Sequence, residues 1–314
     1  MEFGKIRDPG EVDWRLPPED PANRAVLENL PAGSAARVFV GCPIWQDDAL
    51  ARKLCPSGLP KSRRLACYAG QFNALELNAT GYGIDPEKAR QWAAETGAGF
   101  RFCPKVPRDI SHAPDLGEAG DRYRRYAEAA RHFGDRLGPS LLQFPESFGP
   151  GKFLGLERFL DLHAHLIPLA VEVRHRDWFA QPGPRRDLFD LLKAHGVMAV
   201  ITDAPGRRDV LHQRLTASGT FVRFNALAFA GIAGPDERRL HAWAERIKSW
   251  LDQGIGSVYF FAHADPPDLS ADLDALFLAA LNRLTGLRLP APRIRSGAEA
   301  AGNAPNPQLD LFAP

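Results

Sequence analysis

Residues 168–178 read Pro168-Leu169-Ala170-Val171-Glu172-Val173-Arg174-His175-Arg176-Asp177-Trp178, an apolar run that ends in charged, imidazole and indole side chains. The apolar part is too short for a helix and rich in aliphatic residues, so it predicts a buried strand. Because side chains alternate along a strand, Glu172 and Arg174 should share one face. Burying a charge costs on the order of several kcal/mol unless it is paired or used. We therefore expect this acid and base to form an ion pair or a functional site.

Similar runs recur along the chain. They lie at residues 37–41, 74–78, 100–105, 140–144, 197–203, 220–225 and 257–263, and helical patterns separate most of them. Eight strand-then-helix units over about 250 residues match the length of one (β/α)₈ barrel. A doubly wound sheet, the main alternative, would carry a glycine-rich phosphate turn after its first strand, whereas this chain has Gly41-Cys42-Pro43-Ile44-Trp45. The sequence thus predicts a single TIM-type barrel.

Three parts of the chain differ in composition. Residues 1–36 are rich in Pro and Asp, with one short helical pattern at 22–30, and are expected to form an arm that packs on the main body. Residues 37–286 carry the predicted barrel. Beyond Gly286 the chain turns to Pro, Ala, Gly, Asn and Arg without periodicity, so residues 287–314 are predicted to be a flexible tail.

The overall composition is that of an ordinary globular protein. The chain has 314 residues, a formal net charge of +1 and 45% hydrophobic residues, which is enough for a large core. A near-neutral charge argues against a general coating of nucleic acid. No apolar stretch is long enough to span a bilayer and the first residues lack a signal-peptide core, so we expect a cytoplasmic protein.

The four cysteines are Cys42, Cys55, Cys67 and Cys103. Their spacings match neither a zinc knuckle nor an iron–sulfur motif. We therefore expect reduced thiols, although Cys42 and Cys103 both fall at the ends of predicted strands.

A TIM-type barrel has its active site where the carboxyl ends of the strands meet the following loops. Polar residues occupy that position in most of the predicted strands, and we expect them to converge on one mouth. These strand-end residues are Glu76, Asn78, Lys105, Gln143, Glu172, Arg174, His175, Asp203, Arg223, Asn225 and His263. For any one of them, a buried ion network without catalytic function is an equally good interpretation.

We assign roles to this set and to three loop residues. The candidate catalytic residues are Glu76, Glu172, His175 and Asp203. The candidate substrate-binding residues are Asn78, Lys105, Gln143, Arg174, Arg223 and Asn225, together with Trp45, His112 and Trp178 from the loops.

Two mechanisms fit these residues. Without a metal, Lys105, Arg174 and Arg223 would bind an anionic group such as phosphate while Glu172 or His175 transfers protons. With a divalent metal ion, Glu76, Glu172, His175, Asp203 and His263 would supply ligands. Several cations in one mouth raise the cost of binding a dication, so the metal-free site is favoured and no cofactor is predicted. A Schiff base through Lys105 is a third and weaker alternative, because the sequence does not show a lowered pKa.

Six ordered motifs resemble those of the YecE-like family, the domain of unknown function seventy-two. They are Ala74-Leu75-Glu76-Leu77-Asn78, Phe102-Cys103-Pro104-Lys105 with Ile110-Ser111-His112, Leu141-Leu142-Gln143-Phe144-Pro145, Glu172-Val173-Arg174-His175 with Trp178, Thr202-Asp203 and Phe221-Val222-Arg223. The resemblance covers about residues 37–285. It implies a TIM-type barrel with a polar pocket at the carboxyl ends of its strands, and no established reaction.

The tail carries a separate signal, Gln308-Leu309-Asp310-Leu311-Phe312. It is similar to the pentapeptide by which bacterial replication and repair proteins bind the DNA polymerase sliding clamp: a Gln amide for a polar site, then Leu and Phe for an apolar pocket. About twenty flexible residues before it would give a reach on the order of 25 Å. The alternative is that these apolar residues fold back onto the barrel.

These observations give two functional hypotheses. The first is a hydrolase- or lyase-type enzyme on a phosphorylated or other anionic substrate, such as a nucleic acid or its repair product. The second is a non-catalytic ligand-binding or adaptor protein that its tail recruits to the sliding clamp.

Overall fold

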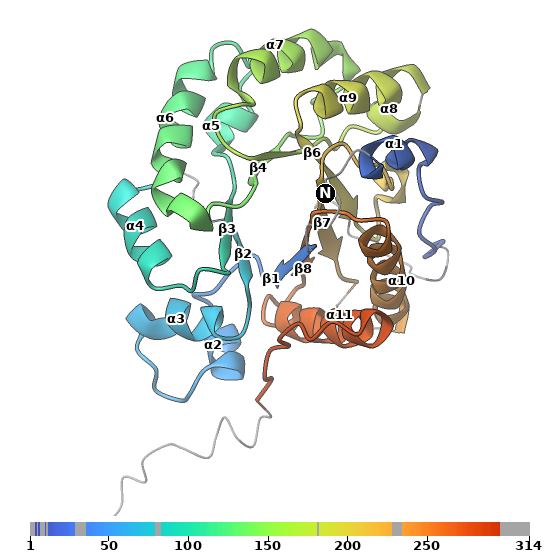
Figure 1. Cartoon of the computed structure of the whole chain (residues 1–314). Helices are drawn as coiled ribbons and strands as arrows, with labels where there is room; N and C mark the ends of the chain where they lie inside the picture. The colour runs from blue at the N-terminus through green and yellow to red at the C-terminus, as the bar shows by residue number, and fades with distance from the viewer. Residues whose placement is uncertain are drawn as a thin grey trace, which may run out of the picture.

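Parallel strands form the centre of the protein in the computed structural model (Figure 1). The structure describes residues 4, 6, 10, 12–28, 36–78, 83–180, 182–227 and 234–295, so the peptide at 308–312 lies outside the described residues. Within these ranges there are eight strands: β1 Arg37–Gly41, β2 Ala74–Leu77, β3 Arg101–Pro104, β4 Ser140–Gln143, β5 Leu169–Glu172, β6 Met198–Asp203, β7 Gly219–Asn225 and β8 Ser257–His263. Each was predicted to within a residue or two at its ends.

The strands pair in two groups. Six of them form a sheet in the order β1-β8-β7-β6-β5-β4, and β2 pairs with β3 in a two-stranded sheet; every pairing is parallel. Two isolated bridges, Phe102 with Leu137 and Lys105 with Leu141, link the β3 segment to the β4 segment. The predicted α/β fold with parallel strands is confirmed. A continuous ladder around a closed barrel is not seen, because pairing is interrupted at the β1–β2 and β3–β4 seams.

Side-chain contacts join β1 to β2 at the first seam. The Asn73 side chain accepts from the Val40 N–H at 2.8 Å and donates to the Val38 carbonyl at 2.8 Å. Three residues further along the same segment, the Glu76 N–H donates to the Cys42 carbonyl at 3.2 Å. A Cβ atom on Gly41 would lie 1.9 Å from the Ala74 carbonyl oxygen, so only glycine permits this close approach of the two backbones.

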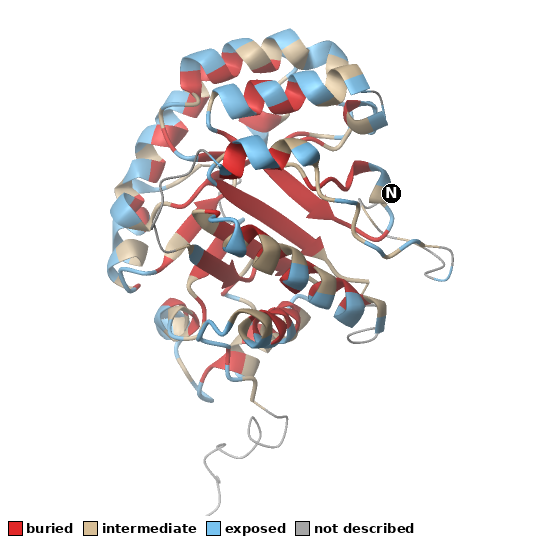
Figure 2. Ribbon diagram, turned by 45° about the vertical axis from the view of Figure 1, so that its right-hand side comes forward, coloured by how far each residue is buried: buried red, intermediate tan, exposed pale blue. Residues whose placement is uncertain are grey.

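Helices surround the strands, and their buried sides face inward (Figures 1 and 2). Asp85 caps helix α4 by accepting from the Glu87 N–H at 2.9 Å, with Pro86 as the first helical residue, as its sequence predicts. The helices in the described residues are α1 Arg24–Leu27, α2 Asp48–Leu54, α3 Arg64–Ala69, α4 Pro86–Ala94, α5 Arg108–Ser111, α6 Gly120–Ala130, α7 Phe153–His163, α8 Asp177–Ala180, α9 Pro182–Ala194, α10 Gly234–Asp252 and α11 Leu269–Thr285.

Alternate strand residues build two kinds of core. One face of the strands packs on the helices in three large apolar clusters. The other face forms a separate inner cluster of Phe39, Ala74, Cys103, Leu141, Ala170, Val200, Phe221, Tyr259 and Phe261. This inner cluster fixes the register: any residue two positions after one of its members, along the same strand, points to the same interior.

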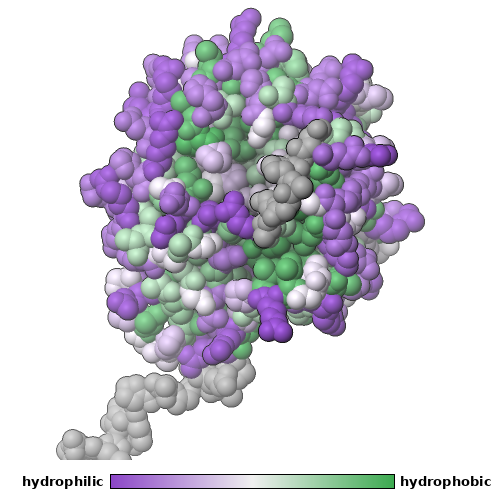
Figure 3. All heavy atoms as spheres, viewed as in Figure 1, coloured by the Kyte–Doolittle hydropathy of each residue, from purple (hydrophilic) through white to green (hydrophobic). Residues whose placement is uncertain are grey.

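Hydrophilic side chains dominate the periphery of the face seen in Figure 3, as expected for helices with one buried side. No helix within the described residues is long and apolar enough to cross a membrane. The N-terminal arm packs on the body through Asn23, whose side chain donates to the Gln213 carbonyl and accepts from the Leu215 N–H, both at 2.7 Å.

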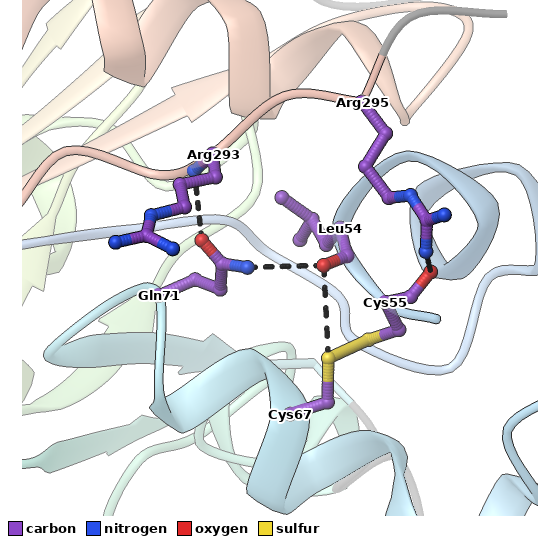
Figure 4. Close-up of a disulfide and its surroundings, with 6 residues drawn as sticks. All are labelled: Leu54, Cys55, Cys67, Gln71, Arg293 and Arg295. Carbon is purple, nitrogen blue, oxygen red and sulfur yellow. Dashed lines mark hydrogen bonds between the residues drawn. A yellow bond between two sulfur atoms is a disulfide. The ribbon is translucent and has the colours of Figure 1, made fainter. Parts of the chain in front are cut away.

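Helix α2 and a disulfide follow β1, in a part of the chain where we expected reduced cysteines. Cys55 and Cys67 form a disulfide that joins the end of α2 to α3 (Figure 4). The expectation of four reduced thiols was therefore wrong for this pair, since a spacing of 12 residues says nothing about whether two cysteines meet in space. Cys42 and Cys103 are free and buried. The last described residue, Arg295, packs against the end of α2, because its guanidinium donates to the Cys55 carbonyl at 3.0 Å.

Candidate functional site

Six strand ends send polar side chains into the interior above the inner apolar cluster. The register places Glu76 two residues after Ala74, Glu172 two after Ala170 and Arg223 two after Phe221. Lys105, Gln143 and His263 follow Cys103, Leu141 and Phe261 in the same way. Hydrogen bonds connect all six side chains into one set, which we call the strand-end network.

Arg223 is the centre of the strand-end network. Its Nε and Nη2 atoms donate to the two carboxylate oxygens of Glu76, both at 2.9 Å, and its Nη1 donates to Glu172 Oε2 at 2.9 Å. Both carboxylates are almost completely buried, and the Arg223 side chain is 7% exposed. One guanidinium therefore neutralises two buried acids, which is what such acids require.

Glu172 extends the network towards β3. It accepts from Arg174 Nε at 2.6 Å and from the Gln143 amide at 2.7 Å. The Gln143 oxygen in turn accepts from Lys105 Nζ at 2.8 Å. Arg174 is 18% exposed and Lys105 is only partly buried, so these two cations lie nearer to solvent than the acids do.

Glu76 extends the network towards β8. His263 Nε2 lies 3.1 Å from Glu76 Oε2, and the Asn78 amide donates to Glu76 Oε1 at 3.2 Å. The His263 side chain is 19% exposed. If Nε2 carries the proton and donates to Glu76, Nδ1 is the basic nitrogen of the ring.

Burial and neighbouring charges together lower the pKa values of the acids Glu76 and Glu172 and of the bases Lys105 and His263. Burial by itself raises the pKa of Glu172, but Arg174, Arg223 and the Gln143 hydrogen bond outweigh it and lower the pKa from 4.5 to about 2. Arg223 and His263 likewise outweigh burial and hold the pKa of Glu76 well below its usual value. Burial, with the Arg223 charge, lowers the pKa of Lys105, and burial lowers the pKa of His263. The acids are thus ionised, while burial makes the charged forms of Lys105 and His263 less favourable than they are in water.

Asp203 does not join this network. It lies one position out of register with the interior, next to the inward-facing Thr202, and points to helix α10. There it accepts from Arg239 Nη2 and from Trp243 Nε1, both at 2.7 Å, and pairs with Arg208. Arg239 is fully buried and also donates to Asp236 at 2.8 Å. The expectation that Asp203 reaches the common mouth therefore fails, and its position indicates a structural ion pair between β6 and α10.

Three other candidates lie outside the strand-end network. Trp178 is fully buried on α8 and donates to the Phe148 carbonyl at 2.7 Å. Trp45 packs edge-on against Trp92 in the outer core. The His175 ring lies against Gly149, and its Nδ1 accepts from the Asp177 N–H at 3.2 Å, at the start of α8. These contacts organise loops and core rather than the interior of the strands.

His112 and Asn225 lie at the edge of the network. His112 follows α5, and burial with the charges of Arg108, Lys105 and Arg174 lowers its pKa, which places it in the field of the two more exposed cations. Asn225 pairs with His263 across β7 and β8, and its carbonyl accepts from Arg239 at 3.1 Å. From the sequence we assigned His263 no role in the metal-free site. Its position at the end of the last strand, two residues after the inward-facing Phe261, could have predicted that it points into the interior.

The metal alternative is weakened by these positions. Of its five suggested ligands, His175 and Asp203 lie away from Glu76, Glu172 and His263. Within the part of the chain that the structure describes, no cluster of three or more His, Cys, Asp or Glu residues is arranged to hold a metal ion.

Parallel strands and an outer layer of helices define an α/β protein, and the polar side chains at the carboxyl ends of its strands form its candidate site. The model of the family described as "Protein of unknown function DUF72" matches residues 39–296, and the chain belongs to this family.

Relatives and solved structures agree with this assignment. The UPF0759 protein YecE of Escherichia coli is 29% identical over 254 residues, covering 74% of this chain and 88% of that protein. The UPF0759 protein YunF of Bacillus subtilis is 26% identical, covering 63% and 73%. A DUF72-family protein of Thermotoga maritima has a similar fold, with a TM-score of 0.60 at 23% identity over 78% of this chain and 99% of that one.

The ionised state of Glu172 gives a prediction about acid stability. Because its folded-state pKa is lowered from 4.5 to about 2, ionisation stabilises the fold by about 3 kcal/mol above pH 4.5, and this is lost as the pH falls towards 2. Glu172→Gln should therefore be less stable than wild type at pH 7, with the difference shrinking below pH 4.5. Urea denaturation from pH 7 to pH 2 measures it, with the exposed Glu237→Gln as control. A difference that does not depend on pH would contradict the assigned ionisation.

Proposed function

We propose that this chain is a closed TIM-type barrel enzyme, of hydrolase or lyase type, that acts on a phosphorylated or other anionic substrate at the carboxyl ends of its strands. The observation that carries the proposal is the position of Arg174 and Lys105, which lie nearer to solvent than the acids they accompany. Lys105 and Arg223 of the strand-end network, together with the adjoining Arg174, place three basic side chains around Glu76 and Glu172. An anion that approaches this end would meet the cations first.

The cations divide between two roles. Arg223 makes three hydrogen bonds to two acids, so its task is to hold Glu76 and Glu172 in place. Arg174 donates from its Nε to Glu172 at 2.6 Å, and its guanidinium is partly exposed. Arg174 is therefore the residue that would bind the anion, with Lys105 beside it.

We propose that His263 or Lys105, rather than Glu172, transfers protons. A carboxylate with a pKa of about 2 that accepts from three side chains is a poor base near neutral pH. His263 has a lowered pKa and is oriented by Glu76 at 3.1 Å. This pair has the arrangement of a general base and the acid that positions it.

Closure of the barrel is part of the proposal. The two bridges between the β3 and β4 segments and the hydrogen bond from Glu76 to Cys42 support it at the two seams. The strand-end network supports it as well, because Glu76 and Lys105 belong to the two-stranded unit while their partners belong to the six-stranded sheet.

A second candidate is recruitment to the DNA sliding clamp through residues 308–312, in which case the protein would act as a ligand-binding adaptor. Its support is the sequence Gln308-Leu309-Asp310-Leu311-Phe312 itself, which combines one amide with apolar side chains in a short linear peptide.

Replacing Arg174 tests the anion site. Arg174→Gln should weaken the binding of inorganic phosphate about ten-fold or more, because a hydrogen bond to a charged group contributes about 1.5–3 kcal/mol. Arg176→Gln removes the same charge two residues away, where the side chain is 76% exposed, and should leave binding unchanged. Isothermal titration calorimetry measures both, and a screen of phosphorylated compounds for hydrolase or lyase activity should show the same order. Equal binding by the two variants would overturn the proposal.

A peptide of residues 300–314 tests the second candidate. We expect it to bind a bacterial sliding clamp in fluorescence polarisation, and Phe312→Ala to abolish binding because the aromatic ring fills the apolar pocket. If neither peptide binds at high micromolar concentration, or both bind equally, the clamp proposal is wrong.

A further inference from the structure

Lys105 is held in an unusual way for a lysine in a charged site. Its Nζ donates to the amide oxygen of Gln143 at 2.8 Å, and the Gln143 amide nitrogen is fixed by donating to Glu172 at 2.7 Å. The amide orientation is therefore set by the acid, which leaves its oxygen for the lysine. The amide oxygen carries no formal charge, so this bond positions the nitrogen without the full negative charge that a carboxylate partner would place beside it.

The surroundings of Lys105 disfavour the charged form. Burial lowers its pKa first, and the nearby Arg223 and Arg174 charges act in the same direction, against Glu76 and Glu172. Both acids are already bound by arginines, at 2.6 to 2.9 Å. Amine nucleophiles in proteins are activated in this way, by burial and by neighbouring cations.

We infer that Lys105 is a nucleophile that forms an imine with the aldehyde or ketone group of an anionic substrate held by Arg174. The inference rests on the proposed anion site and names its substrate class: a small carbonyl compound that carries a phosphate or carboxylate group. It also selects between the two reaction types, since an imine serves a lyase rather than a simple hydrolase.

The chemistry balances within the site. The neutral Lys105 nitrogen attacks the carbonyl carbon, a C–N bond forms and the C=O π bond breaks; the nitrogen then gives up one proton and the oxygen takes one up, which gives a neutral carbinolamine. Loss of this hydroxyl as water, with a second proton, leaves a protonated imine. His263 and His112, both with lowered pKa values, are the nearby groups that can pass these protons. The positive imine then draws electrons from the adjacent carbon, so that a bond at that carbon can break.

Reductive trapping tests this inference on the full-length protein. The wild type is incubated at pH 7 with glyoxylate or with glyceraldehyde 3-phosphate, reduced with sodium cyanoborohydride, and analysed by peptide mass spectrometry. We expect at least ten-fold more adduct on Lys105 than on the exposed Lys193 of α9, and suppression by excess inorganic phosphate. Lys105→Arg keeps the positive charge and should lose this adduct. Arg174→Gln should reduce it, because the anion is no longer held.

The outcomes separate the inference from the proposed function. If phosphate binds in an Arg174-dependent way but Lys105 reacts no more than Lys193, the imine is wrong and the anion site stands. If phosphate binding does not depend on Arg174 and Lys105 shows no preference, both are wrong. The comparison of Lys105 with Lys193 in the wild type is enough to test the imine. The test therefore remains valid even if Lys105→Arg folds poorly.

Discussion

One guanidinium bound to two buried carboxylates is the interaction on which this structure depends. Arg223 on β7 reaches Glu76 on β2 and Glu172 on β5, and none of the three has more than a few per cent of its surface exposed. The two sheets are not joined by a continuous ladder, so the bond from Arg223 to Glu76 crosses between them. Removing one partner of such a group leaves an uncompensated charge in the interior and costs about 3–5 kcal/mol.

The same arrangement determines which groups of the site act as fixed charges and which can exchange protons. Hydrogen bonds from arginines hold Glu76 and Glu172 ionised and remove them as bases, while their charges act on Lys105 against burial and the Arg223 charge. The groups whose charged forms burial disfavours are Lys105 and His263, whose pKa values are lowered. Structural and chemical roles are thus divided among residues of one network.

The sequence predicted the strands well because their apolar runs are short and bounded, and it predicted the inward pairs because side-chain alternation is strict. Asp203 shows where that reasoning stops. It ends a predicted strand as Glu172 does, but it is one residue out of register, and the partner that defines its role, Arg239, lies on a helix 36 residues later. Trp45 and Trp178 were assigned from their positions in loops, where the sequence gives no register at all. The Cys55–Cys67 disulfide depends on the packing of α2 against α3 and had no local signal.

A double-mutant cycle between Glu76 and Arg223 tests most directly whether this bond joins the two strand groups. Urea denaturation of Glu76→Gln, Arg223→Met and the double variant gives the coupling free energy between the two side chains. The geometry predicts a coupling of about 2 kcal/mol or more, since each substitution alone strands the other's charge. Additive effects, within about 0.5 kcal/mol, would contradict the view that Arg223 binds Glu76 in the interior of the fold.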